Sequence, residues 1–239
     1  MKTIGMIGGM SWESSIEYYR LVNEAVKQQL GGLHSAQCLL YSVDFDEIER
    51  YQHQGDWEPA TQVMIAAAQR LERGGADFVV ICTNTMHKMA DEVQAAIQLP
   101  LLHIVDATAQ AIKTQGLSKV GLLGTRFTMQ EDFYVGRLRS HGLDVIIPDA
   151  EEREIVHRII YQELVLGKIL PSSRDEYQRI IQNLAQRGAE GIVLGCTEIG
   201  LLVKQDDIEL PVFDTTLVHA LAAVEVVLGK IRIEDFLPR

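Results

Sequence analysis

The chain has 239 residues, of which 47% are hydrophobic and 23% charged, and its formal net charge at pH 7 is −11. This balance is typical of a globular protein and excludes a disordered chain. No apolar run approaches the about 18 residues of a membrane span, and Lys and Arg form no cluster that would suit a phosphate backbone. We therefore expect no membrane anchor, no nucleic-acid partner and a small-molecule ligand. The start of the chain lacks the features of a secretory signal, so a cytoplasmic protein is expected.

Eight apolar, β-branched runs of strand length follow one another along the chain, and most gaps between them carry helical periodicity. Continuous apolar runs separated by helices are typical of parallel strands that are buried on both faces, which predicts an α/β fold. In the first gap, Ile16, Tyr19, Val22 and Val26 share a predicted helix face. The predicted strands are residues 3–7, 37–43, 78–81, 101–105, 120–123, 145–147, 191–194 and 211–213.

An internal repeat divides this series of elements into two halves. Gly5 in the first strand has its counterpart in Gly121, at an offset of 116 residues, and Cys82 has its counterpart in Cys196, at an offset of 114 residues. The repeat predicts two similar lobes with mainly parallel sheets, related by a pseudo-twofold duplication, and an active site in the cleft between them. The predicted lobes are residues 1–105 plus 215–239 and residues 106–214.

Two of the three cysteines occupy equivalent places in this repeat. Cys82 and Cys196 each end an apolar strand and are each followed by threonine, whereas Cys38 lies inside a predicted strand. A turn from strand to helix offers backbone N–H groups that favour negative charge and so favour a thiolate. A lone cysteine at the end of a strand is more often a core residue, but the pairing points to chemistry for Cys82 and Cys196. Cys38 is predicted to be a core residue.

The turns after the first strand of each half offer further candidates. Residues 8–11 place two glycines before Met10 and Ser11, and Ser11 is a candidate helix N-cap. Thr125 holds the matching place in the second half. The glycine spacing fits neither a dinucleotide fingerprint nor a phosphate loop. The seven histidines lack the spacing of a zinc site, so no metal is expected, and His87 is predicted to be a core or helix-surface residue.

Three segments of the sequence carry a resemblance to a known family. They are residues 8–14 (GGMSWES), 82–87 (CTNTMH) and 195–200 (GCTEIG). Here the chain resembles the aspartate/glutamate racemases, PLP-independent enzymes of two α/β lobes with a cysteine from each lobe beside the substrate. The resemblance implies a cofactor-independent isomerase that acts on a small amino acid and forms a homodimer.

The resemblance also implies roles for individual residues. Cys82 and Cys196 would be the two acid/base groups, and Glu198 stands where the related glutamate racemases have histidine, as in the aspartate-type branch. Arg50 and Lys168 are candidates for binding a side-chain carboxylate, although each could equally be a solvated surface residue. The candidates for holding the rest of the substrate are Met10, Ser11, Thr83, Asn84, Thr85, Thr125 and Thr197.

Several functions remain compatible with these residues. Interconversion of the enantiomers of aspartate or glutamate is the first, and a pocket without a strong cation would instead give a racemase of broad specificity. A hydantoin racemase or a maleate isomerase would use the same paired cysteines on another substrate. A protein that binds an amino acid without turning it over is the alternative outside enzyme chemistry.

Overall fold

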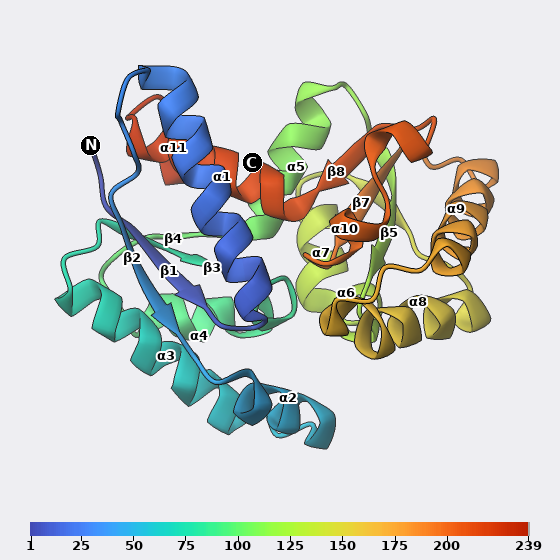
Figure 1. The fold of residues 1–239 in the computed structure, drawn as a ribbon, viewed down its shortest axis with the longest axis horizontal. Helices are drawn as coiled ribbons and strands as arrows, with labels where there is room; N and C mark the ends of the chain where they lie inside the picture. Colours follow the sequence, from blue (N-terminus) through green and yellow to red (C-terminus); the bar gives the residue numbers. More distant parts are fainter. Residues whose placement is uncertain (239) are drawn as a thin grey trace. The chain divides into compact units, whose positions relative to one another are not determined.

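The computed structural model describes residues 1–238 and divides into two compact units. The first unit comprises Met1–Ile104 and His219–Leu237, and the second comprises Val105–Val218 together with Pro238. Each unit holds one four-stranded parallel sheet with helices packed on it (Figure 1). None of the described helices is both long enough and apolar enough to cross a membrane.

The first unit is built on the strand order β2-β1-β3-β4, in which every neighbouring pair is parallel. The two inner strands are fully buried, as expected for strands covered by helices on both faces. The elements are β1 (Ile4–Gly8), α1 (Trp12–Leu30), β2 (Cys38–Ser42), α2 (Phe45–Gln54), α3 (Trp57–Arg73), β3 (Phe78–Ile81), the 3-10 helix η1 (Thr85–Met89), α4 (Ala90–Ala95) and β4 (Leu101–Leu102).

Alternate residues of β1 face the two helical layers of the first unit. Ile7 packs in one core cluster with α3, and a Cβ atom added to Gly5 would lie 3.2 Å from the Leu71 Cβ of that helix. On the opposite face, a Cβ atom at Gly8 would lie 2.5 Å from Ser15 Oγ of α1. Figure 1 shows α1 and α3 on either side of this sheet. Each large apolar side chain buried here contributes about 1.5–3 kcal/mol of transfer free energy.

The second unit repeats this plan with the strand order β6-β5-β7-β8, again entirely parallel. Its main core cluster joins β5 and β7 to α8 and α9. The helix α11 starts in the second unit and continues into the first. The elements are α5 (Ile104–Thr114), β5 (Lys119–Gly124), α6 (Arg126–Gln130), α7 (Asp132–Ser140), β6 (Asp144–Ile146), α8 (Ala150–Gln162), η2 (Leu164–Leu166), α9 (Pro171–Gln186), β7 (Gly191–Gly195), α10 (Ile199–Leu202), η3 (Gln205–Asp207), β8 (Val212–Asp214), α11 (Thr215–Val227) and η4 (Ile233–Phe236).

The structure confirms the predicted α/β class and its two similar parallel sheets, with three local corrections. The strand predicted over residues 101–105 ends at Leu102, because α5 already begins at Ile104. The predicted apolar face of α1 is wrong for Ile16 and Tyr19, which are exposed, since Tyr18 and Leu21 turn toward the sheet instead. Cys38 is only partly buried, because its strand β2 lies at the edge of the sheet.

Candidate active site

Cys82 follows the inner strand β3 of the first unit and is almost completely buried, with 1% of its surface exposed. Its backbone N–H donates to the Ile7 carbonyl of β1 at 2.9 Å. Its own carbonyl accepts a hydrogen bond from Ser14 Oγ of α1 at 3.3 Å. The residue is therefore fixed on both sides, by the neighbouring strand and by the helix that follows that strand.

The turn after β1 lies beside this cysteine, because β1 and β3 are paired in parallel. Gly9 has a φ of +95°, and a Cβ atom there would lie 2.2 Å from the Val43 carbonyl oxygen, so only glycine fits. The predicted N-cap is confirmed, since Ser11 Oγ accepts a hydrogen bond from the Ser14 N–H at 3.3 Å. Met10 is 4% exposed and packs in the core cluster of the unit.

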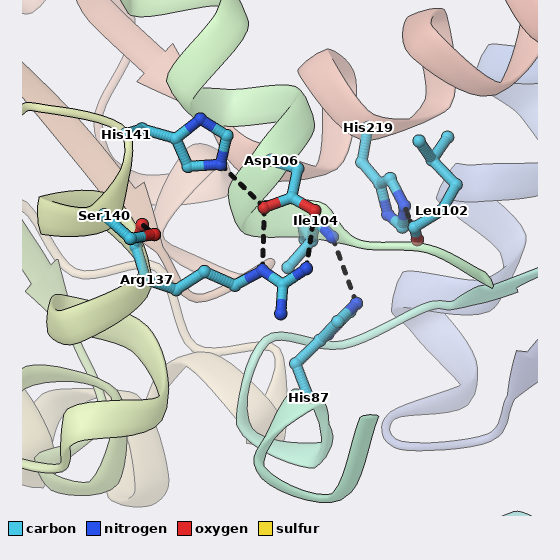
Figure 2. Close-up of polar contacts among 8 residues, drawn as sticks. All are labelled: His87, Leu102, Ile104, Asp106, Arg137, Ser140, His141 and His219. Atoms are coloured by element: carbon cyan, nitrogen blue, oxygen red, sulfur yellow. Dashed lines mark hydrogen bonds and ion pairs between the residues drawn. The ribbon is translucent and has the colours of Figure 1, made fainter. Parts of the chain in front are cut away.

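His87 holds the backbone of the cysteine turn. Its Nδ1 lies 2.8 Å from the Thr83 carbonyl. Its Nε2 accepts a hydrogen bond from the Ile104 N–H at 3.1 Å (Figure 2). Since a carbonyl only accepts and the Ile104 N–H only donates, the imidazole is neutral with its proton on Nδ1. The intervening Asn84 and Thr85 are buried. His87 is thus a core residue, and the four-residue spacing from Thr83 was the available signal for its contact.

A second buried histidine of the first unit, His219, was not singled out in the sequence. Its Nε2 donates to the Leu102 carbonyl at 2.9 Å (Figure 2). Its Nδ1 therefore accepts from Tyr18 Oη at 2.8 Å. This arrangement ties α11 to β4 and to α1. No short-range motif marks this contact, because the partners are separated by 117 and 201 residues along the chain.

Cys196 takes the corresponding place in the second unit, directly after the inner strand β7. It is partly buried, and its Sγ donates to the Glu198 carboxylate at 3.1 Å. The same carboxylate oxygen accepts from Thr197 Oγ1 at 2.6 Å. Glu198 is 6% exposed, so this carboxylate is held at the start of α10 by two side-chain donors.

Thr125 lies at the carboxyl end of the neighbouring strand β5, where Gly124 pairs with Gly195. Its Oγ1 accepts from the Thr128 N–H at 3.3 Å and caps α6, and the residue is 6% exposed. The second unit therefore brings Thr125 to the same edge of the sheet as the Cys196 turn. This is the edge at which open α/β sheets bind ligands.

Burial raises the pKa of both thiols above the ordinary value of cysteine. For Cys82 burial is the largest cause. For Cys196 burial is again the largest cause, and the negative charge and hydrogen bond of Glu198 add to it. Both residues are accordingly thiols at neutral pH in the free protein, and deprotonation of either one requires a bound positive charge or another compensating interaction.

The two candidate cations both lie on exposed segments. The Arg50 guanidinium on α2 stacks on the Tyr51 ring at 5.4 Å from the ring centre. Lys168 is exposed in the link between η2 and α9, where its N–H donates to the Glu163 carbonyl at 2.9 Å. Lys168 thus lies in the second unit, which also carries Cys196.

Sequence reasoning also missed a buried ion cluster in the second unit. Asp106 of α5 is 2% exposed and receives both Arg137 Nε and Arg137 Nη2 at 2.7 Å, as well as His141 Nε2 at 2.8 Å (Figure 2). Burial alone would raise the pKa of Asp106, but the hydrogen bonds from Arg137 and His141 outweigh burial and lower it. The cluster joins α5 to α7. In residues 1–238, no three His, Cys, Asp or Glu side chains are grouped so as to hold a metal ion.

Comparison with known proteins identifies the family. A family model described as Asp/Glu/hydantoin racemase matches residues 7–223. The chain belongs to this family. Its members are racemases, which are isomerases, so the resemblance seen in the three sequence segments is confirmed.

The relatives of this racemase-family chain differ in the substrates that their names imply. A candidate Asp/Glu racemase from Yersinia pestis is 58% identical, covers 95% of this chain and 100% of its own, and superposes with a TM-score of 0.90. An aspartate racemase homologue from Pyrococcus horikoshii OT3 is 37% identical, with coverages of 95% and 100% and a TM-score of 0.84. A broad-specificity amino-acid racemase from Bacillus subtilis (strain 168) is 27% identical over 177 residues, 73% of this chain and 75% of the relative.

Proposed function

We propose that the chain interconverts the L and D enantiomers of aspartate or glutamate, without metal or PLP, by a two-base mechanism that uses Cys82 and Cys196. The observation that carries the proposal is positional. Each cysteine ends the equivalent inner strand of one of two parallel sheets with the same strand order, and each is followed by threonine. Duplicated units that each supply one thiol suit a reaction that is symmetric between two faces of a carbon atom.

The chemistry requires two such groups. In the proposed reaction one cysteine, as thiolate, takes the Cα proton and becomes a thiol, while the electron pair of the broken C–H bond delocalises into the α-carboxylate. The other cysteine, as thiol, gives its proton to the opposite face of Cα and becomes the thiolate. The substrate's own ammonium group supplies a positive charge that favours a thiolate, which opposes the effect of burial on both thiols.

Donors for the developing charge on the α-carboxylate come from the two cysteine turns. We assign this role to the hydroxyl and amide groups of residues 83–85, to Thr125 and to Thr197, with Met10 and Ser11 shaping the first turn. Donors fixed in advance toward a developing oxyanion typically contribute about 3–4 kcal/mol each to catalysis. Glu198 acts through Cys196, because its carboxylate lies 3.1 Å from that thiol.

The proposed preference for acidic substrates rests on the Arg50 and Lys168 side chains. Both side chains are exposed, and the Arg50 guanidinium stacks on the Tyr51 ring. A preference for acidic amino acids therefore depends on whether either side chain reaches the side-chain carboxylate of the substrate. The similarity to a broad-specificity amino-acid racemase supports a second candidate, the same reaction on neutral amino acids. We also propose that the protein is a cytoplasmic homodimer, with twice the chain mass of 26.7 kDa.

Chiral chromatography of single enantiomers incubated with the pure, dialysed protein tests the proposal. Aspartate or glutamate should racemise faster than alanine or serine. Cys82→Ala and Cys196→Ala should each abolish the rate, because each removes the acid or base of one face, whereas Cys38→Ala should keep it. A cysteine variant that racemises near the wild-type rate would exclude the two-thiol mechanism. Equal kcat/KM for aspartate and alanine would favour the broad-specificity candidate, and binding without turnover would exclude racemase activity.

A further inference from the structure

The two candidate catalytic thiols differ in the side chain that stands two residues after each of them. After Cys82 it is Asn84, a neutral amide, and among residues 1–238 no hydrogen bond reaches the Cys82 thiol. After Cys196 it is Glu198, whose buried carboxylate accepts a hydrogen bond from the thiol itself at 3.1 Å. The duplicated units therefore carry one thiol without a carboxylate partner and one thiol with such a partner.

The Glu198 carboxylate favours the protonated form of Cys196. An S–H group that points at a carboxylate oxygen forms a charge-assisted hydrogen bond, whereas a thiolate at the same distance would meet a like charge with little water between them. Thr197 Oγ1 donates to the same oxygen at 2.6 Å and so holds the carboxylate in place beside the thiol. Glu198 thus adds to burial in favouring the protonated thiol, against the backbone N–H groups of Glu198 and Ile199, which favour the thiolate.

Among the groups that shift the pKa of Cys196, none is a positively charged side chain. Tyr177 of α9 is buried, and burial, with smaller contributions from Cys196 and Glu163, holds its pKa well above the ordinary value, so it stays neutral. Its Oη donates to the Val156 carbonyl at 3.2 Å. The Glu163 carboxylate accepts a hydrogen bond from Ser173 and lies 3.6 Å from Arg158 Nη1.

We propose that Glu198 is a positioning residue that adds to burial in keeping Cys196 protonated in the free enzyme, and so favours Cys196 over Cys82 as the proton donor. The inference rests on the proposed racemase function for its catalytic meaning. The local part of the inference, that the Glu198 carboxylate favours the protonated form of Cys196, does not rest on that function. In the reaction, the S–H bond of Cys196 breaks as the new Cα–H bond forms, and Glu198 itself neither gains nor loses a proton.

The test measures how fast iodoacetamide alkylates each cysteine as a function of pH, with each cysteine followed by mass spectrometry of its own peptide. In Glu198→Gln the midpoint pH for Cys196 should fall, and a midpoint lower by about one pH unit makes alkylation below the midpoint about tenfold faster. The midpoint for Cys38, which is only partly buried and lies in the first unit, should not move, and this residue serves as an internal reference in every sample. A loosened turn would also hydrate the thiol and lower its midpoint, so a second variant, for which charge and loosening predict opposite shifts, is needed to separate the two causes.

Two further variants keep the test decisive. Glu154→Gln removes an exposed carboxylate of α8 in the same unit and should leave the Cys196 midpoint unchanged. Thr197→Val removes the second donor to the Glu198 oxygen and should raise the Cys196 midpoint, which tests the inference even if Glu198→Gln fails to fold. A Cys196 midpoint that stays or rises in Glu198→Gln, or that falls in Thr197→Val, would overturn the inference. If the midpoints move as expected in a protein without racemase activity, the proposed function fails and the local inference stands.

Discussion

Asp106 is the side chain whose charge most clearly stabilises the second unit. Its carboxylate is 2% exposed and is bound by Arg137 and His141. Removal of one member of such a buried ion pair leaves the others without their counter-charge, which costs about 3–5 kcal/mol. We therefore expect Asp106→Asn to lower the free energy of unfolding by this amount at pH 7, as measured by urea denaturation.

The contribution of Asp106 to the free energy of unfolding should depend on pH. The pKa of Asp106 is lowered in the folded protein, so its contribution is complete above the unfolded pKa of about 3.9 and is lost as the pH falls through the folded value. The stability gap between the wild type and Asp106→Asn should be constant near neutral pH and should shrink under acid conditions. Asp144→Asn is the control, because Asp144 pairs with Lys119 at 3.6 Å near the surface and should cost less than about 1 kcal/mol. An Asp106→Asn protein as stable as the control would contradict the assigned role.

Among the elements, the turn after β1 most strictly requires one residue type, glycine at position 9. Gly9 combines a φ of +95° with a close approach of 2.2 Å between its added Cβ and the Val43 carbonyl. Gly75, in the same unit, has a φ of +90° and no atom within 4 Å of its added Cβ. Gly75→Ala should therefore cost only the about 1–2 kcal/mol of the left-handed conformation.

Gly9→Ala should cost distinctly more than Gly75→Ala, because its Cβ also displaces the backbone at Val43. It should also lower the proposed racemase activity, since the turn lies beside the Cys82 strand. The free energies of unfolding of the two variants give the comparison directly. Equal costs would mean that the turn yields easily and that its glycine is not required by packing.

The strands were predictable because a buried parallel strand is encoded locally, by a short apolar run rich in β-branched residues. Phe78–Ile81 has the predicted bounds for that reason. The face of α1 was less predictable, since Ile16 and Tyr19 fit the helical period yet are exposed at 56% and 54%. Which apolar stripe of a helix turns inward depends on the sheet beneath it, and the helix sequence does not contain that information.

The candidate site shows the same division between local and distant information. The three segments around Ser11, Cys82 and Cys196 are local motifs and could be identified from the sequence. The contacts that fix them are distant, as with His87 and Ile104, which are 17 residues apart, or Ser14 and Cys82, which are 68 residues apart. Such pairs become visible only when the helices and strands are packed together.

At the scale of the whole molecule, the net charge of −11 repels an anionic substrate. Salt should relieve this repulsion, since the Debye length falls from about 30 Å at 0.01 M to about 8 Å at 0.15 M ionic strength. Over that range we expect kcat/KM for aspartate to rise by about twofold or more, while that for alanine, which carries no net charge, stays level. A fall with salt for aspartate would mean that a local cation, such as Arg50 or Lys168, dominates the approach of the substrate.

Racemisation in D2O, followed by NMR and chiral chromatography at early times, distinguishes two opposed thiols from a single base. The proton donor exchanges with solvent before substrate binds, so the product enantiomer should carry deuterium at Cα from the first turnovers while the recovered substrate still carries hydrogen. In Cys82→Ser or Cys196→Ser, inversion should be lost, and the enantiomer facing the intact thiol should still exchange its Cα hydrogen. Deuterium that enters recovered substrate as fast as product in the wild-type protein would show that one group serves both faces, and would contradict the assignment of Cys82 and Cys196 as an opposed pair.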